Sequence, residues 1–170
     1  MARLVMLSGL PGSGKSTLGR LLAERASAEY LRIDVFEQAL RDLNGADFDV
    51  GTGGYKRGYE LATHHLQAGR DVIVDAVNAI EAARQGWRDI ARSAGAEIVE
   101  IEIVCSDPDE VHTRLQTRET GIEGLAPVTM EAVQARRWDP NPYCTYTLDT
   151  GGREVPDCLA ELLQVTGLAA

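Results

Sequence analysis

Short runs of apolar residues alternate along the chain with longer segments in which apolar positions recur every three or four residues. The first pattern is typical of strands buried on both faces, and the second of amphipathic helices. Strands are predicted over residues 3–8, 30–33, 71–75, 97–105 and 145–148. Helices are predicted over residues 14–26, 35–43, 55–68, 81–94, 108–118, 129–137 and 155–164. This alternation indicates an α/β fold, a parallel sheet with helices on both faces.

No repeat, low-complexity stretch or linker interrupts the pattern, so we expect residues 1–170 to form a single domain. Two glycine-containing irregular segments, 44–54 and 119–128, are expected to supply loops that close on a ligand. In the fourth predicted strand, Glu100 and Glu102 alternate with apolar residues. This alternation indicates that one face of the strand is wetter than the other.

The net charge of −9 is distributed unevenly over the 170 residues. Residues 1–33 carry +3, which leaves −12 for residues 34–170. Such an acidic chain disfavours general binding to nucleic acid or to anionic membranes, because both require a surplus of positive charge. Cys105, Cys144 and Cys158 lack metal-ligand spacing, and no apolar stretch approaches the ~20 residues of a membrane span. We therefore expect reduced thiols in a cytoplasmic protein.

Residues 9–16, Gly-Leu-Pro-Gly-Ser-Gly-Lys-Ser, match the Walker A pattern G-x-x-x-x-G-K-[ST] between a predicted strand and a predicted helix. The backbone N–H groups of such a loop bind phosphate oxygens. Lys15 is suited to bridge the terminal phosphates of a nucleotide, and the Ser16 hydroxyl is suited to Mg²⁺. The alternative is a glycine-rich turn without a ligand. The predicted nucleotide-binding residues of this segment are Gly9, Pro11, Gly12, Ser13, Gly14, Lys15, Ser16 and Thr17.

Two aspartates follow predicted strands, Asp34 the second and Asp75 the third. In an open parallel sheet, ligands bind beyond the carboxyl ends of the strands, so both carboxylates should face the same crevice as the Walker A loop. Asp34 is then placed to accept a proton from an attacking hydroxyl, and Asp75 to organise the Mg²⁺ hydration shell. The assignment of these two roles can also be reversed, and either aspartate could instead cap a helix.

Arg114 and Arg118 lie four residues apart on a predicted helix, next to the irregular segment 119–128. Arginines beside a loop that closes can neutralise the charge of a transferring phosphoryl group. The alternative is a solvated helix face that pairs with Glu110 and neighbouring acids. Arg136 and Arg137 are a second possible source of these cations.

Other nucleotide-binding classes lack their signatures here. Neither Lys15 nor Lys56 follows an asparagine, so the Asn-Lys-x-Asp segment that selects guanine in GTPases is absent. The glycine-rich loop, strand lysine and His-Arg-Asp segment of protein kinases are absent as well.

The sequence resembles a known group in four segments. These are the Walker A segment with its following helix, Ile-Asp at 33–34, Gly-Arg-Asp-Val-Ile-Val-Asp-Ala-Val-Asn at 69–78 and Arg-x-x-x-Arg at 114–118. The group is the small P-loop kinase family, often labelled AAA-type ATPase domain. Its relatives include gluconate and shikimate kinases, adenylylsulfate kinase, chloramphenicol phosphotransferase, zeta toxins and polynucleotide 5′-kinases. The resemblance implies a three-layer fold around a five-stranded parallel sheet in the order 2-3-1-4-5, with an acceptor region at about 36–66 and a small lid at about 119–137.

The resemblance also assigns roles to single residues. An aspartate that matches Asp34 acts on the acceptor hydroxyl, and arginines that match Arg118 and Arg114 clamp the nucleotide, Arg114 near the adenine. Several relatives carry arginine where this chain has Glu37. That departure, with the acidic remainder of the chain, favours a neutral or cationic acceptor over a strongly anionic one.

The resulting hypothesis is an ATP- and Mg²⁺-dependent kinase that transfers the γ-phosphoryl group to a hydroxyl of a small molecule. Its predicted catalytic residues are Lys15, Asp34 and Arg118, and its predicted metal site contains Ser16 and Asp75. Two alternatives stay open: a polynucleotide 5′-hydroxyl kinase, which the acidic charge disfavours, and an ATP-binding regulatory module or slow ATPase without an acceptor. The sequence carries no signal for an oligomeric state.

Overall fold

A computed structural model describes residues 1–168 of the chain. All strands of its five-stranded sheet run parallel, in the order β2-β3-β1-β4-β5. The α/β class and the strand order 2-3-1-4-5 are thereby confirmed. The strands are β1 (Arg3–Ser8), β2 (Glu29–Arg32), β3 (Val72–Asp75), β4 (Glu97–Val104) and β5 (Tyr146–Asp149).

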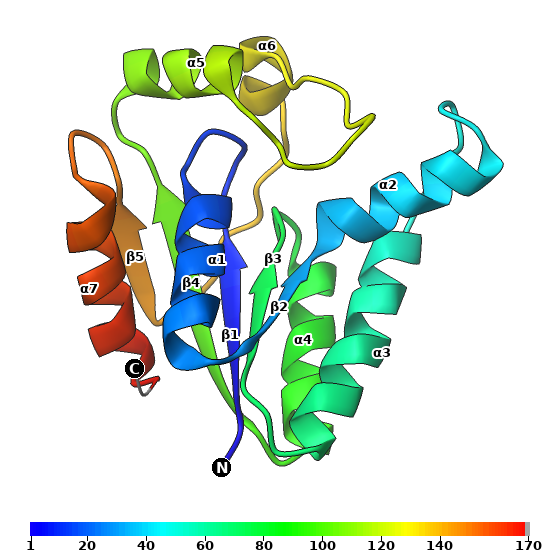
Figure 1. The fold of residues 1–170 in the computed structure, drawn as a ribbon, viewed down its shortest axis with the longest axis vertical. Helices are drawn as coiled ribbons and strands as arrows, with labels where there is room; N and C mark the ends of the chain where they lie inside the picture. Colours follow the sequence, from blue (N-terminus) through cyan, green and yellow to red (C-terminus); the bar gives the residue numbers. More distant parts are fainter. Residues whose placement is uncertain (169–170) are drawn as a thin grey trace.

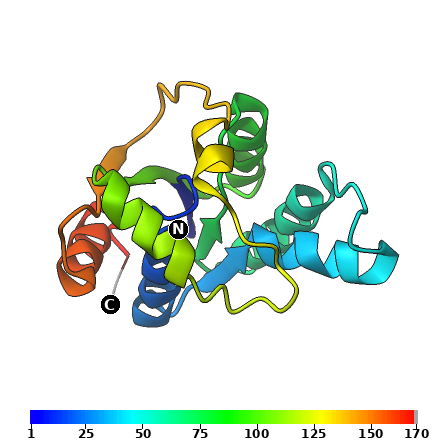
Figure 2. The same cartoon turned by 90° about the horizontal axis from the view of Figure 1, so that it is seen from above.

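Helices cover both faces of the sheet (Figure 1). One face carries α1 (Lys15–Ala26) and α7 (Val155–Thr166), and the other carries α3 (Gly53–Gln67) and α4 (Glu81–Ser93). Next to α3, α2 (Ile33–Asn44) projects beyond the sheet, and α5 (Pro108–Thr117) and α6 (Met130–Gln134) lie across the carboxyl ends of the strands (Figure 2). Within residues 1–168, no helix combines the length and the apolar character that a membrane crossing requires.

Alternate residues of β1 serve two separate cores. Val5 and Leu7 pack against α1 and α7, whereas Leu4 and Met6 pack against the α3 and α4 side, and all four are fully buried. Trp87 of α4 fills the second core and donates its indole N–H to Asn78 over 3.0 Å. Burial of each large apolar side chain stabilises the fold by about 1.5–3 kcal/mol, so β1 is the most strongly held strand of the sheet.

Most predicted boundaries differ from the observed ones by a residue or two, and two of the differences bear on the site. The second strand ends at Arg32, and Asp34 lies in the first turn of α2 rather than at the strand end. Ile33 begins this helix because its side chain turns inward and is buried in the second core. The predicted helix 129–137 is reduced to α6, because Thr129 caps its start while residues 139–141 are drawn to α4.

The expectation of a wetter face on the fourth strand is wrong for Glu100, which is only 3% exposed. Its carboxylate accepts two hydrogen bonds from the Arg88 guanidinium, at 2.5 and 2.9 Å. Nearby, the fully buried Arg84 donates to four backbone carbonyls, those of residues 78, 79, 139 and 140. These paired charges fix the segment that returns from α6 to the sheet.

Candidate active site

The Walker A loop forms a narrow turn between β1 and α1. Gly14 caps α1 in a left-handed conformation at φ 92°, which a residue with a Cβ rarely adopts. A Cβ at Gly9 would collide with the backbone carbonyl of Ile103 on β4. Both positions therefore require glycine. The loop directs the amino end of α1 and its free N–H groups toward the carboxyl ends of the strands.

Lys15 and Asp75 lie together at the carboxyl ends of the central strands. Lys15 is 5% exposed and Asp75 2% exposed, and the Lys15 Nζ is 3.9 Å from the Asp75 Oδ1. Burial lowers the pKa of Lys15, and the negative charges of Asp75 and Asp34 oppose this shift. A bound phosphate would oppose it further, so the site favours an anionic ligand beside the ammonium group.

Tyr30 of β2 holds Asp75 from the other side. Its hydroxyl donates to the Asp75 Oδ2 over 2.6 Å and lies 3.3 Å from the Ser16 carbonyl oxygen. Burial and the adjacent carboxylate raise the pKa of Tyr30 far above its ordinary value, so the phenol stays protonated and remains a donor. Tyr30 thereby fixes the orientation of the Asp75 carboxylate, a contact that the sequence analysis missed.

Arg32, the last residue of β2, is a further cation that sequence reasoning missed. Its Nε lies 3.7 Å from the Asp75 Oδ2, and its Nη2 lies 3.4 Å from the Asp34 Oδ2. Its Nη1 donates to the backbone carbonyl of Thr120 over 2.6 Å. Within residues 1–168, the buried Nε has no hydrogen-bond partner. Arg32 therefore links both aspartates to the first residues after α5.

Asp34 is half-buried and lies between two arginines. Besides Arg32, the Arg118 Nη2 approaches its Oδ2 to 3.8 Å. Arg118 is the residue after the last turn of α5 and has an extended backbone, so it does not share a helical face with Arg114 as the spacing had predicted. The Asp34 carboxylate is therefore held between two guanidinium groups, one from β2 and one from the end of α5.

Arg114 of α5 spans the Walker A loop and the turn after β5. Its Nη1 donates to the Gly12 carbonyl over 3.2 Å and to the Thr150 Oγ1 over 2.8 Å. Thr150 in turn donates from the same oxygen to the Ser13 carbonyl over 2.8 Å. Arg114 also pairs with Glu110, the contact that the surface alternative predicted, and its role toward a nucleotide stays a prediction.

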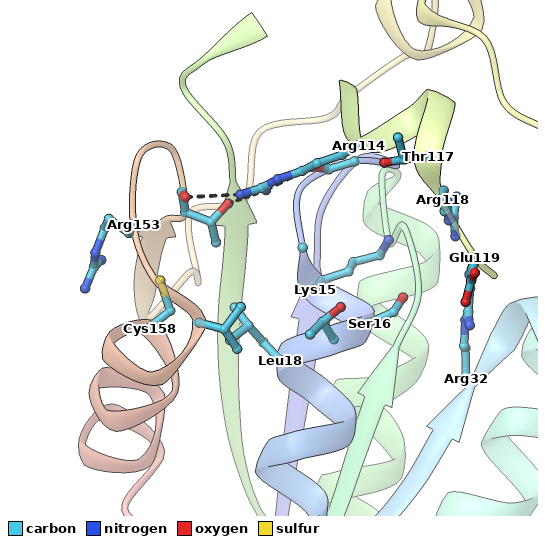
Figure 3. A pocket seen from close by; sticks show the side chains of 15 residues that line it. Lys15, Ser16, Leu18, Arg32, Arg114, Thr117, Arg118, Glu119, Arg153 and Cys158 are labelled. Carbon is cyan, nitrogen blue, oxygen red and sulfur yellow. Dashed lines mark hydrogen bonds between the residues drawn. The ribbon is translucent and has the colours of Figure 1, made fainter. Parts of the chain in front are cut away.

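A cavity of about 310 Å³, the Arg114 cavity, opens above α1. Figure 3 shows Arg114 and Arg153 on one wall and Arg32 and Arg118 on the opposite wall, with Lys15 and Ser16 between them. Cations thus surround the end of the cavity nearest the Walker A loop. The lining residues are Gly12, Gly14, Lys15, Ser16, Thr17, Leu18, Arg32, Arg114, Thr117, Arg118, Glu119, Thr150, Arg153, Val155 and Cys158.

A second cavity of about 450 Å³, the Glu37 cavity, lies between α2 and the segment that precedes α6. Lys15 and Arg118 line both cavities, so the two spaces meet at these cations. Asp34, Glu37 and Arg41 contribute from α2, and residues 124–128 form the opposite, mainly apolar wall. Burial, with the nearby Asp34, raises the pKa of Glu37, while the charges of Arg41 and Arg136 lower it.

The residues at the junction fit a magnesium–nucleotide complex. Ser16 supplies a hydroxyl in the first turn of α1, and Asp75 a carboxylate that Tyr30 and Lys15 hold in place. In residues 1–168, no group of three or more His, Cys, Asp or Glu side chains is arranged to bind a metal alone. One hydroxyl and one carboxylate, as Ser16 and Asp75 provide, fit Mg²⁺, which proteins hold through one or two side chains together with substrate phosphates.

The predicted site residues fall into three groups, and Asp75 belongs to the one that lines neither cavity, since it lies buried beneath Lys15. Gly12, Gly14, Lys15, Ser16, Thr17, Arg114 and Arg118 line the Arg114 cavity, and Asp34 and Pro11 line the Glu37 cavity. Gly9 and Ser13 line neither of them and instead shape the loop from the β4 side. Of the two alternative arginines, Arg136 reaches the Glu37 cavity, whereas Arg137 is exposed and pairs with Asp139.

The family model described as AAA domain matches residues 4–137. Uncharacterized proteins of Mycobacterium tuberculosis and Mycobacterium bovis are 29% identical over 165 residues, which covers 88% of this chain and 32% of theirs. The chain therefore spans about a third of the length of these curated relatives.

Solved structures of kinases share the fold over nearly the whole chain. A sugar kinase from Janibacter sp. has a TM-score of 0.73 at 17% identity, with 99% of this chain and 96% of that chain covered. An APS kinase from Mycobacterium tuberculosis has a TM-score of 0.63 at 20% identity, with 96% of each chain covered. A gluconokinase from Sinorhizobium meliloti has a TM-score of 0.66 at 16% identity, with 96% of this chain and 90% of that chain covered. The chain belongs to the AAA domain family, and its fold is that of the small P-loop kinases.

Proposed function

We propose that this protein is an ATP- and Mg²⁺-dependent phosphotransferase whose acceptor is a hydroxyl of a small molecule bound in the Glu37 cavity. The observation that carries this proposal is the meeting of the two cavities at Lys15 and Arg118. A nucleotide in the Arg114 cavity would place its terminal phosphate at that junction, within reach of a hydroxyl from the other side. Positioning of this kind accounts for most of the catalysis in phosphoryl transfer.

Each residue at the junction then has a defined task. Lys15 and the loop N–H groups bind the phosphates, and Arg118 with Arg32 offsets the charge that develops on the transferred group. Asp34 orients the acceptor hydroxyl and receives its proton as the oxygen bonds to the γ-phosphorus. The bond from that phosphorus to the β–γ bridging oxygen breaks, and ADP leaves. Mg²⁺, held through Ser16 and Asp75 together with the phosphates, would supply further charge neutralisation.

The test is ATP consumption by the purified protein in the presence of sugars, sugar acids, amino sugars and nucleosides, with product identified by mass spectrometry. We expect acceptor-dependent ADP formation that Asp34→Asn lowers about 100-fold or more, because the proton acceptor is lost. Arg20→Gln on the exposed face of α1 is the matched control and should leave turnover unchanged. An oligonucleotide with a 5′-hydroxyl tests the polynucleotide alternative.

Two results would refute the proposal. If ATP binds but no acceptor increases its consumption, and Asp34→Asn leaves basal hydrolysis unchanged, the protein is a nucleotide-binding module or slow ATPase. If only the oligonucleotide is phosphorylated, with activity that falls steeply with salt, the acceptor is a nucleic acid.

A further inference from the structure

Two arginines line the Glu37 cavity from different elements. Arg41 comes from the third turn of α2, and Arg136 from the segment after α6. Within residues 1–168, neither guanidinium lies within 4.0 Å of a carboxylate, and neither side chain donates a hydrogen bond. Their charges act on the same carboxyl group, Glu37, from two different elements. Two cations without a bound partner thus face one small cavity.

Charges are ordered along the face of α2 that lines this cavity. Asp34, Glu37 and Arg41 follow each other at three- and four-residue intervals, which places them on one face of the helix in successive turns. Seven residues of α-helix rise about 10 Å, so the phosphoryl-transfer end and the arginine end are separated by the length of a small molecule. Glu37 and Gln38 lie between these two ends and offer hydrogen-bonding groups.

The charges that remain for a ligand are positive at the arginine end. Asp34 already lies beside Arg32 and Arg118, so its charge is balanced at the transfer end. Two carboxylates lie near Arg41 and Arg136: burial raises the pKa of Glu37, and Asp42, an exposed residue, already accepts a hydrogen bond from Gln38. An anionic group on the acceptor would balance this surplus, whereas an ammonium group would add to it. Two guanidinium groups can also bind one oxyanion through several charge-assisted hydrogen bonds.

We propose that the acceptor is an anionic hydroxyl compound, with a carboxylate or phosphate group that binds Arg41 and Arg136 while its hydroxyl lies at Asp34. This inference rests on the proposed phosphotransferase function and narrows it. It replaces the expectation of a neutral or cationic acceptor, which placed Arg41 one turn beyond Glu37 but did not include Arg136, the arginine that the fold adds to this cavity. The apolar wall at residues 124–128 covers the ligand between its two ends.

The experiment compares open-chain polyols of several lengths that differ only in one end group: carboxylate, phosphate, hydroxymethyl or aminomethyl. Product formation and kcat/KM are measured for each with ATP and Mg²⁺. We expect a carboxylate or phosphate compound to exceed its hydroxymethyl counterpart by about tenfold or more in kcat/KM. The carboxylate and phosphate arms identify which oxyanion is the natural one.

Arginine variants assign that preference to the cavity. Arg41→Gln and Arg136→Gln should each raise the KM for the anionic acceptor about tenfold, with a much smaller change in the KM for ATP. Arg57→Gln on the exposed face of α3 is the control, since Arg57 lines neither cavity and, within the described residues 1–168, forms an ion pair with Glu60 alone. The split between the two KM values separates acceptor binding from a general loss of folding.

Three outcomes would overturn the inference. A hydroxymethyl or aminomethyl compound as the best acceptor would leave the phosphotransferase function intact and refute the anionic acceptor. An anion preference that survives both arginine variants would refute the assigned binding residues. No phosphorylation of any compound by a protein that binds ATP would count against this inference and against the proposed function together.

Discussion

Replacement of Arg32 by glutamine tests whether this arginine acts on the transferred phosphoryl group or only holds the unliganded site together. Its guanidinium lies beside two aspartates, at 3.4 Å from Asp34 and 3.7 Å from Asp75, and donates to the Thr120 carbonyl over 2.6 Å. The side chain also lines the Arg114 cavity next to Lys15. When Asp75 helps to hold Mg²⁺ and Asp34 binds an acceptor, the same guanidinium is free to approach the γ-phosphate.

The two interpretations predict different magnitudes. Loss of the charge-assisted bond to Thr120 costs about 1.5–3 kcal/mol, and removal of a cation that is only 12% exposed offsets part of that cost. A net loss of about 1–2 kcal/mol lowers the melting temperature by roughly 2–8 °C for a domain of this size. Loss of one donor to the transition state lowers kcat about 100- to 1000-fold.

The assay combines thermal unfolding of the unliganded protein with steady-state kinetics for Arg32→Gln. We expect both the small stability loss and the large fall in kcat, with a much smaller change in the KM for ATP. Arg32→Lys keeps the charge without the planar fork and should recover part of kcat. Arg20→Gln should match the wild type in both measurements, because its salt bridge to Glu24 is exposed.

One combination of results would refute the catalytic role. If Arg32→Gln shows the expected loss of stability but keeps kcat within about threefold, a factor that corresponds to less than 1 kcal/mol, then Arg32 only braces the aspartates and the segment at Thr120. Recovery of kcat by added guanidinium would instead support direct action on the phosphoryl group.

Three further predictions concern stability. The pKa of Glu37 is raised, so the stability linked to its protonated form is present below its ordinary pKa and is lost as the pH rises through the raised value. Glu37→Gln should therefore have a higher melting temperature than the wild type at neutral pH, and the difference should close in acid. Equal melting temperatures at neutral pH would contradict this. Glu100→Gln removes the buried carboxylate partner of Arg88 and leaves it only the more exposed Glu81, so we expect a loss of up to about 3–5 kcal/mol in the free energy of unfolding by urea. Glu100→Leu combined with Arg88→Met should cost much less, and equal losses would refute the pairing argument. Gly58→Ala places a Cβ 2.9 Å from the Trp87 ring, so overpacking should lower the free energy of unfolding by about 1–3 kcal/mol, despite the better helix propensity of alanine. A higher free energy of unfolding would show that the core side chains move to accommodate the methyl group.

The nucleotide half of the site could be predicted from sequence because its parts are contiguous. Residues 9–16 carry their own glycine pattern, and the buried run of β1 before them and the helix after them are both local signals. Asp75 was predictable too, because it is the last residue of a short buried strand. Parallel packing then brings β1 and β3 side by side, and their ends meet.

Other contacts depend on residues far apart in the chain. Arg32 donates to Thr120 across 88 positions, and Arg88 pairs with a carboxylate on another element, so neither contact leaves a periodic or composition signal. From sequence, Glu100 is expected to face solvent, because its buried partner Arg88 lies on another element. From sequence, Tyr30 is an ordinary aromatic residue of a strand, and its role becomes visible only when the fold places Asp75 beside its hydroxyl.

The position of Asp34 explains why the acceptor half was harder to predict than the nucleotide half. As the end of a strand, Asp34 would stand alone at the carboxyl ends of the strands, and its neighbours in sequence would alternate between the two faces of the sheet. In the first turn of α2, it instead begins a face that continues through Glu37 to Arg41. Because β2 ends one residue earlier than predicted, Asp34 is one end of a charged helix face that lines the Glu37 cavity, and not an isolated carboxylate at a strand end. The register between strand and helix, more than the identity of any one residue, determines which charges an acceptor encounters.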